Sequence, residues 1–287
     1  MAMRLDQTSA WILATVIAAM EAIGFYLGTA KVVTTQTDHI NAQSKGEGSE
    51  SLGRLEPTPG KLQKWGYHGA IGPMFWADID DQFEKCRAGK SQSPIDIGQW
   101  KFDRKLPRLK LGYRSTDLEL TREGSLLVAR LPKGAQRLSY AGMNLSLEKI
   151  SFHAPSEHTI KGVHYDGEIQ LLHYNSNRKL YILSVLIKGE PGAPSSEFLQ
   201  VVNQAAQSQE GATWYGASPD LLLPENLQYF TYKGSLTYPP CVEGVTWLVL
   251  DEPLIWAKSD LRQIQQLLGR NVRPIQRKER VAIRMSP

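Results

Sequence analysis

Two short stretches decide how this chain is expected to fold: residues 151–158 read SFHAPSEH, and residues 168–173 read EIQLLH. Alternate side chains of a β-strand lie on one face, so Ser151 and His153 are predicted to point together. An antiparallel return strand would bring Gln170 opposite them. Histidine at all three positions would form a tripod for zinc, but only His153 is one. The sequence therefore predicts the frame of a metal-binding hairpin that lacks two of its ligands.

Other sequence blocks support the same frame, and they follow in a fixed order along the chain. They are residues 65–67 (WGY), 92–97 (QSPIDI), 229–240 (YFTYKGSLTYPP), 245–247 (VTW) and 271–274 (NVRP). Together with the hairpin, this ordered set resembles the α-type carbonic anhydrases from about Trp65 to about Ile283. The resemblance implies a mixed α/β, β-dominated fold with a large twisted, mostly antiparallel central sheet and short peripheral helices.

Length and composition agree with such a domain and exclude several functions. The chain has 287 residues, of which 41% are hydrophobic, so it can bury a substantial core. A formal net charge of +4 is too small to predict nucleic-acid binding, and no basic helix or aromatic-interleaved basic patch supports it. No nucleophile elbow, phosphate-binding glycine loop or Cys-x-x-Cys pair is present, so nucleophilic, nucleotide and thiol-redox chemistry lack support.

The first 64 residues differ in kind from the rest. Residues 10–30 are apolar apart from Glu21, and their length matches the ~20 residues that a helix needs to span a bilayer. We predict a short segment 1–9, a transmembrane anchor 10–30, a polar linker 31–64 and a domain 65–287. A cleaved secretory signal is the alternative, because the apolar run before Glu21 is short and residues 28–30 (GTA) resemble a cleavage site.

Glu21 lies near the middle of the predicted span. An ionisable side chain at bilayer depth costs roughly 2.5–3.5 kcal/mol on insertion scales, so it normally faces a protein partner or a polar cavity. We therefore hypothesise that Glu21 docks the anchor against another transmembrane subunit of a membrane complex. The alternative is that Glu21 is protonated, or that the helix sits shallowly in the membrane.

The two cysteines fall at places that match the half-cystines of secreted and periplasmic members of the family. The resemblance thus implies a Cys86–Cys241 disulfide, for which the chain-entropy model gives up to ~5 kcal/mol. It also implies an oxidising compartment, with the amino terminus in the cytoplasm and the domain in the periplasm or an equivalent lumen. Two buried free thiols are the alternative.

The resemblance assigns the hairpin residues to specific roles. Ser151, His153 and Gln170 occupy the first, middle and third zinc-ligand positions of the family. A serine hydroxyl stays protonated near neutral pH, and a glutamine carbonyl is a neutral oxygen, so both are weak zinc ligands. We expect no stoichiometric zinc and no other cofactor.

Lys149 shares the strand face of Ser151 and His153, at a position that is usually a neutral glutamine in active relatives. An ammonium directed at the site would oppose a divalent cation. We hypothesise that Lys149 pairs with Glu168 or Glu157, which match the supporting acids of the family. The alternative is that Lys149 bends outward to water, as most lysines do.

Further site positions are retained. Thr237 and Glu157 match the pair that orients zinc-bound hydroxide in active members. The residues that match the apolar wall for carbon dioxide are Leu172, Ile182, Leu236, Val245 and Trp247. His158 and His173 match structural positions, so we predict hydrogen-bonded core residues there.

Two functions follow from these features. The first is a membrane-anchored carbonic-anhydrase-like protein without catalytic activity, which serves as a binding or structural module such as a peripheral subunit of a membrane complex. The second is a slow carbonic anhydrase in which His153 and another residue hold the metal of a remodelled site. The missing ligands, Glu21 and the linker favour the first, whereas the retained wall and the Thr237–Glu157 pair favour the second.

Overall fold

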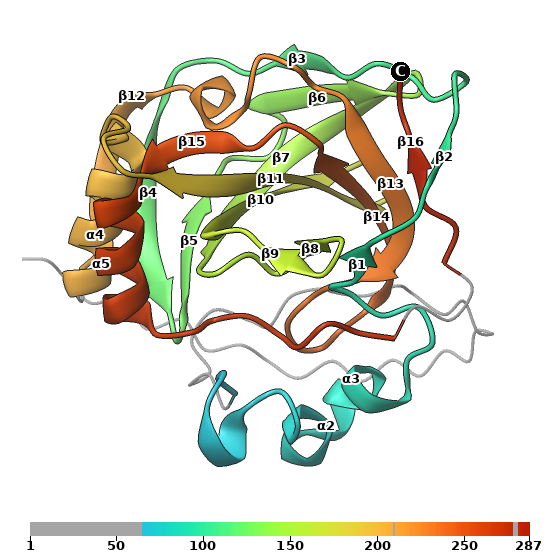
Figure 1. The fold of residues 1–287 in the computed structure, drawn as a ribbon, viewed down its shortest axis with the longest axis horizontal. Coiled ribbons are helices and arrows are strands. Elements are labelled where there is room, and N and C mark those ends of the chain that lie inside the picture. The colour runs from blue at the N-terminus through green and yellow to red at the C-terminus, as the bar shows by residue number, and fades with distance from the viewer. Residues whose placement is uncertain (1–64, 209, 278–280) are drawn as a thin grey trace, which may run out of the picture. The chain divides into compact units, whose positions relative to one another are not determined.

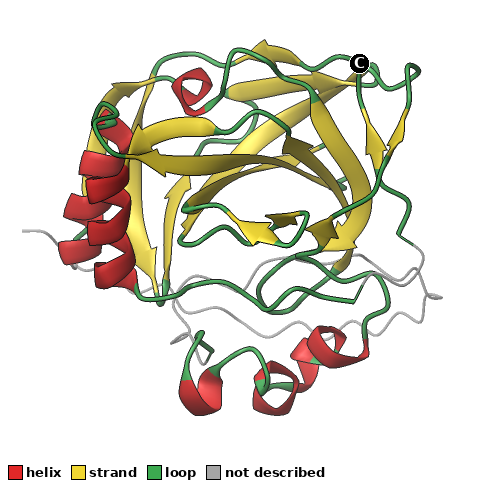
Figure 2. Cartoon of the chain, in the orientation of Figure 1, coloured by secondary structure: helices red, strands yellow, loops and turns green. Residues whose placement is uncertain are grey.

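The computed structural model describes residues 65–208, 210–277 and 281–287, and β-strands dominate it (Figures 1 and 2). The strands are β1 (Asp96–Ile97), β2 (Lys101–Phe102), β3 (Lys110–Gly112), β4 (Thr116–Glu123), β5 (Leu126–Arg130), β6 (Gln136–Tyr140), β7 (Met143–His153), β8 (Thr159–Ile160), β9 (Val163–His164), β10 (Gly167–Tyr174), β11 (Leu180–Glu190), β12 (Ala212–Ala217), β13 (Tyr229–Ser235), β14 (Glu243–Leu250), β15 (Leu254–Ala257) and β16 (Arg284–Met285). The helices are α2 (Trp76–Ile79), α3 (Lys85–Ala88), α4 (Glu197–Gln207) and α5 (Lys258–Leu268), with short 3-10 turns η1 (Gly69–Ile71), η2 (Asp81–Phe83) and η3 (Pro219–Leu222).

One large sheet of thirteen strands organises the domain, and its main path runs β12-β4-β5-β7-β10-β11-β14-β13-β16-β2. Most neighbours along this path are antiparallel, but β11–β14, β11–β15 and β16–β2 pair in parallel, so the sheet is mixed. A small sheet of β1, β8 and β9 lies apart from it. The predicted β-dominated fold with short helices is therefore confirmed.

The middle of the sheet is buried on both faces. All eight residues of β10 are buried, although they include Glu168, Gln170 and His173. Burial is therefore continuous along β10 and does not alternate from one residue to the next, because both faces of the sheet are covered. Buried polar groups must find partners there, and these partners build the site described below.

Two apolar clusters cover the two faces. One includes α4 and α5, which pack against each other (left in Figure 1) and bury the apolar face of α4 through residues such as Phe198 and Val202. The other is formed around Trp65, Tyr67 and Trp76. This second cluster also contains all five predicted wall residues, namely Leu172, Ile182, Leu236, Val245 and Trp247. The candidate site thus lies on the face of the sheet opposite to α4.

The predicted disulfide is present between Cys86 of α3 and Cys241, with an S–S distance of 2.05 Å. It ties the amino-terminal helices to the segment that follows β13. The alternative of two free thiols is wrong.

The predicted anchor 10–30, with Glu21, and the linker 31–64 lie outside the described residues. Within the described part, none of the helices combines the length and the apolar character needed to cross a membrane.

Candidate functional site

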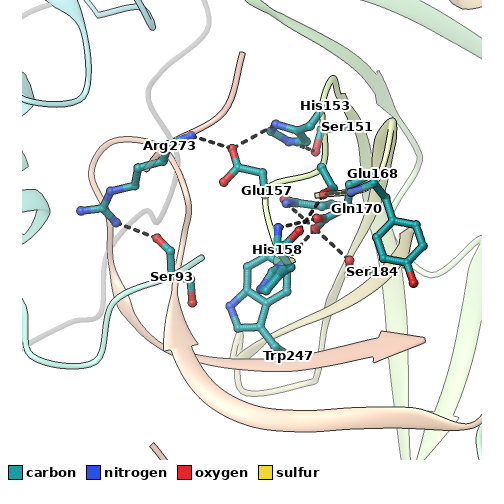
Figure 3. Close-up of polar contacts among 12 residues, drawn as sticks. Ser93, Ser151, His153, Glu157, His158, Glu168, Gln170, Ser184, Trp247 and Arg273 are labelled. Carbon is teal, nitrogen blue, oxygen red and sulfur yellow. Dashed lines mark hydrogen bonds and ion pairs between the residues drawn. The ribbon is translucent and has the colours of Figure 1, made fainter. Parts of the chain in front are cut away.

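Strands β7 and β10 place the three predicted ligand positions on one buried face. Ser151 and His153 are two residues apart on β7, and Gln170 of β10 lies directly opposite Ser151 in the antiparallel register. All three residues are at most 1% exposed, and Figure 3 shows the polar contacts around them. The predicted hairpin and its register are confirmed.

Both ring nitrogens of His153 already have partners. Nδ1 lies 3.0 Å from the backbone oxygen of Asn271 and 3.3 Å from Oε1 of Glu157. A proton on Nδ1 satisfies both oxygens, which leaves Nε2 as an acceptor in the neutral ring. The hydroxyl of Ser151 lies 3.2 Å from Nε2. The nitrogen that would bind a metal is therefore capped by the residue that replaces a second ligand.

Gln170 is held by the carboxylate of Glu168. Its Nε2 donates to Glu168 Oε1 at 3.1 Å, which fixes the orientation of the amide. The same carboxylate accepts hydrogen bonds from the backbone nitrogen of His158 at 2.8 Å and from Ser184 Oγ at 2.8 Å. Its Oε1 also lies 3.0 Å from His158 Nδ1. Glu168 is thus saturated with donors in a fully buried place.

The contacts of Glu168 continue into a wider chain of hydrogen bonds. His158 Nε2 lies 2.7 Å from the hydroxyl of Tyr232, which lies 2.8 Å from Ser93 Oγ. The His158 ring also packs edge-on against Trp247 at 4.7 Å between centroids. We call the set of His158, Glu168, Ser184, Tyr232 and Trp247 the outer network.

His173 satisfies its ring separately from the outer network. Nδ1 lies 2.8 Å from the oxygen of Leu171, and Nε2 lies 2.7 Å from the hydroxyl of Tyr113. The prediction of hydrogen-bonded core histidines at His158 and His173 is confirmed.

The buried acids respond differently to their surroundings. Burial alone would raise the pKa of Glu168, but the His158 ring and the hydrogen bonds from His158 outweigh it and hold the pKa at about 2. Burial raises the pKa of Glu157 instead. Burial opposes protonation of His153, yet the hydrogen bond and charge of Glu157 raise the pKa of its ring. The two buried side chains are thus coupled to each other through their contact of 3.3 Å.

Lys149 is buried, and its contacts include Tyr238 and Glu123. Its Nζ lies 3.4 Å from the hydroxyl of Tyr238 and 3.8 Å from Oε2 of Glu123, and it sits 5.0 Å from the centre of the Tyr238 ring. Glu168 is in contact with His158, Gln170 and Ser184, and Glu157 is in contact with His153, so the hypothesised pairing of Lys149 with either acid stays a prediction. The alternative of a solvated Lys149 is wrong, because its side chain is only 5% exposed.

The predicted Thr237–Glu157 pair is not formed. Thr237 Oγ1 and Glu157 Oε2 are both buried, and neither has a hydrogen-bond partner in the described part of the chain. Glu157 uses its other oxygen to accept from the backbone nitrogen of Arg273 at 3.2 Å. The Tyr67 hydroxyl and Gln170 Oε1 are also buried and without partners among these residues. We call Tyr67, Ser151, Glu157, Gln170 and Thr237 the inner cluster.

The side chains around His153 do not fit zinc. A zinc site of the hydrating type needs three nitrogen-rich ligands and an open position. This chain offers one imidazole whose Nε2 contacts Ser151, one neutral amide oxygen and one protonated hydroxyl. Across the described residues, no group of three or more His, Cys, Asp or Glu side chains is placed to hold a metal ion. That the protein carries no zinc stays a prediction.

Sequence reasoning missed several residues that build the site. Arg273 donates through its guanidinium to Gln92 and to the backbone oxygens of Ser93 and Cys86, at 2.6–2.8 Å. The side chain of Asn271 holds the backbone of Ala154. Both Asn271 and Arg273 lie in the 271–274 block, which marked the resemblance without a role being assigned to it. Arginine is almost never buried without partners, so recognising Arg273 as a buried residue would have predicted these contacts.

Comparison with known proteins agrees with this fold and site frame. The family model of the eukaryotic-type carbonic anhydrases matches residues 71–285. A carbonic anhydrase of Neisseria gonorrhoeae is 32% identical over 219 residues, which cover 76% of this chain and 86% of the relative. The α-carbonic anhydrase of Thermovibrio ammonificans, solved with the inhibitor sulfanilamide, superposes with a TM-score of 0.69 at 32% identity, covering 77% of this chain and 98% of that one. A dioscorin complexed with ascorbate gives a TM-score of 0.70 at 27% identity, covering 78% and 98%.

Proposed function

Because the chain belongs to the eukaryotic-type carbonic anhydrase family, we propose that it keeps the family fold as a binding or structural module and does not hydrate carbon dioxide. The observation that carries this proposal is the donor set around His153. Two ligand positions hold Ser151 and Gln170, and the remaining imidazole is capped by Ser151. Loss of even one group that supports a metal ligand commonly costs ten- to a hundredfold in metal affinity, so loss of two ligands costs more.

A membrane-tethered position is part of the proposal. Residues 10–30 would anchor the chain, residues 31–64 would link the anchor to the domain, and the domain would face the periplasm or an equivalent oxidising lumen. The Cys86–Cys241 disulfide supports an oxidising compartment, since structural disulfides persist there. Glu21 would contact another transmembrane subunit of the complex.

Metal analysis combined with a stopped-flow hydration assay tests the loss of activity. We expect less than a tenth of an equivalent of zinc after incubation with the metal, and no hydration above the buffer rate. The matched control is the triple variant Lys149→Gln, Ser151→His, Gln170→His, which restores a three-histidine set on the same backbone. Stoichiometric zinc in the unmodified chain contradicts the proposal, whereas failure of the folded triple variant to bind zinc contradicts the assigned positions.

A second candidate function is carbon dioxide hydration at a remodelled metal site. Two observations favour it. The relative from Neisseria gonorrhoeae is named a carbonic anhydrase, and the five apolar wall residues lie together in one buried cluster. This candidate requires His153 as a ligand, so His153→Ala should abolish any hydration that the unmodified chain shows.

The membrane partner is tested by the Glu21→Leu variant. After gentle detergent extraction, we expect the variant to lose the subunits that co-purify with the unmodified chain, while its domain stays folded. Met20→Leu, which also keeps the side-chain volume nearly unchanged in the same predicted span, is the matched control and should keep them. Unchanged co-purification of the Glu21→Leu variant contradicts a role for Glu21 in docking.

A further inference from the structure

Four buried oxygen atoms have no hydrogen-bond partner among the described residues, and all four belong to the inner cluster. They are Tyr67 Oη, Glu157 Oε2, Gln170 Oε1 and Thr237 Oγ1. Buried polar atoms nearly always have partners, because an unpaired one keeps its full cost of desolvation. We propose that the inner cluster binds one small uncharged molecule that donates several hydrogen bonds, of the amide or urea type.

The four atoms come from separate parts of the chain that meet at the hairpin. Gln170 lies opposite Ser151, and His153 connects Ser151 to Glu157 through contacts of 3.2 and 3.3 Å. Tyr67 packs edge-on against Trp65 at 5.7 Å between ring centroids, and Trp65 stacks on Tyr238, the neighbour of Thr237, at 5.9 Å.

Thr237 lies in the segment after β13, which packs beside the hairpin. Its neighbours Leu236 and Tyr238 both belong to the apolar cluster that contains Tyr67 and Leu172. The Tyr238 hydroxyl lies 3.4 Å from Nζ of Lys149, two residues before Ser151. Thr237 itself is fully buried between these two anchored neighbours.

The unpaired atoms call for a ligand that donates. Gln170 Oε1 is a fixed acceptor, because the amide nitrogen of the same side chain already donates to Glu168. Glu157 Oε2 adds an oxygen of a carboxyl group, and the hydroxyls of Thr237 and Tyr67 can accept or donate. One planar molecule with two or more N–H groups can satisfy acceptors on several elements at once, whereas an apolar molecule would leave all four unpaired.

Charge around the site excludes strongly charged ligands. The ammonium of Lys149 lies on the same strand face as Ser151 and opposes a cation. The carboxyl groups of Glu157 and Glu168, together with the Gln170 oxygen, oppose an anion. Moving a charge into such a buried place costs far more than moving a neutral amide that pairs all of its polar atoms. An uncharged ligand is repelled neither by the Lys149 ammonium nor by the carboxyl groups.

The inference rests on the proposed absence of metal, and the two can fail separately. Zinc uptake would overturn the proposed function, whereas the ligand is tested on full-length protein shown to be free of zinc. Acetamide, acetate and acetamidinium have nearly the same planar shape and carry charges of 0, −1 and +1. Ligand-observed saturation-transfer NMR and the thermal unfolding midpoint then measure binding of each probe.

We expect acetamide to bind at least tenfold more tightly than acetate or acetamidinium and to raise the unfolding midpoint. Thr237→Val and Tyr67→Phe each remove one unpaired hydroxyl and keep the shape, so each should weaken acetamide binding at least fivefold without lowering the unfolding midpoint of the ligand-free protein. Thr246→Val is the matched control, because this buried threonine on β14 instead accepts a hydrogen bond from Lys233. It should leave acetamide binding unchanged.

Three outcomes overturn the inference: no binding of acetamide, equal binding of the three probes, or binding that neither cluster variant weakens. The first means that water alone meets the unpaired oxygens. If Thr237→Val does not fold, Tyr67→Phe alone decides between the outcomes. A metal-binding site would respond differently, since chelator would abolish it and acetamide would not.

Discussion

The outer network and the inner cluster lie on the same pair of strands, yet they differ in how their polar atoms are satisfied. In the outer network, the Glu168 carboxylate accepts from His158, Gln170 and Ser184, and His158 continues to Tyr232. In the inner cluster, four buried oxygens lack partners among the described residues. The outer network therefore holds the hairpin together through its hydrogen bonds. The unpaired oxygens of the inner cluster contribute no such bonds, so we expect that these residues can be substituted without loss of the fold.

The largest difference is expected for the central acid of the outer network. Glu168→Gln removes a buried charge that four contacts depend on, so we expect unfolding free energy to fall by about 3 kcal/mol or more. Glu148→Gln is the matched control on β7, because Glu148 pairs with the half-exposed Arg178 and should cost less than ~1 kcal/mol. Urea unfolding measures both. Similar losses for the two variants would mean that the buried contacts of Glu168 stabilise the fold no more than a half-exposed ion pair does.

Acid should destabilise the fold through its buried titratable groups, with Glu168 of the outer network as the main contributor. The pKa of Glu168 lies at about 2 in the folded protein against 4.5 normally, so its stabilisation is present above pH 4.5 and is lost as the pH falls toward 2. Burial lowers the pKa of His173 to about 3 from 6.5, so unfolding also becomes easier as the pH falls from 6.5 toward 3. Glu168 alone accounts for a loss on the order of 3 kcal/mol.

Urea unfolding midpoints between pH 7 and pH 3 check this expectation. Glu168→Gln should lose less stability than the unmodified chain between pH 4.5 and pH 3, because it has no carboxylate to protonate there. Parallel pH profiles of the two proteins would show that the acid sensitivity arises elsewhere.

The same comparison explains how much could be predicted from the sequence. Strand alternation placed Ser151, His153 and Gln170 on one face, because side-chain direction in a strand follows from local pattern. The fold and the Cys86–Cys241 bridge followed instead from the resemblance to the family, because no local pattern pairs cysteines that lie 155 residues apart. The partners of Lys149 could not be predicted. A flexible four-carbon side chain reaches Tyr238 and Glu123, which lie far away in the sequence, and no local pattern indicates that contact.

Lys149 tests whether a charge at the edge of the inner cluster matters for stability. Its acid partner Glu123 has a side chain that is 35% exposed, so water can solvate that carboxylate when the lysine is removed. We expect Lys149→Met to cost about 1–2 kcal/mol, which is less than the 3–5 kcal/mol of a stranded buried charge. Chemical denaturation gives the value. A loss above 3 kcal/mol would mean that Lys149 stabilises the fold as strongly as the residues of the outer network do.

Two serines provide the finest comparison, because they flank the same residue. Gln170 lies between Ser151 of β7 and Ser184 of β11 in the sheet register, and both serines are buried. Ser184 donates to the Glu168 carboxylate at 2.8 Å, whereas Ser151 lies 3.2 Å from a ring nitrogen of His153.

Hydrogen bonds to charged groups contribute roughly 1.5–3 kcal/mol and neutral ones about 1 kcal/mol, so Ser184→Ala should cost about 1 kcal/mol more than Ser151→Ala. Both variants create the same small loss of volume, so packing cancels in the difference. Paired urea titrations at pH 7 resolve a gap of this size. An equal or reversed order would mean that Ser151 supports the fold as strongly as the outer network does, and that the inner cluster is not free to change.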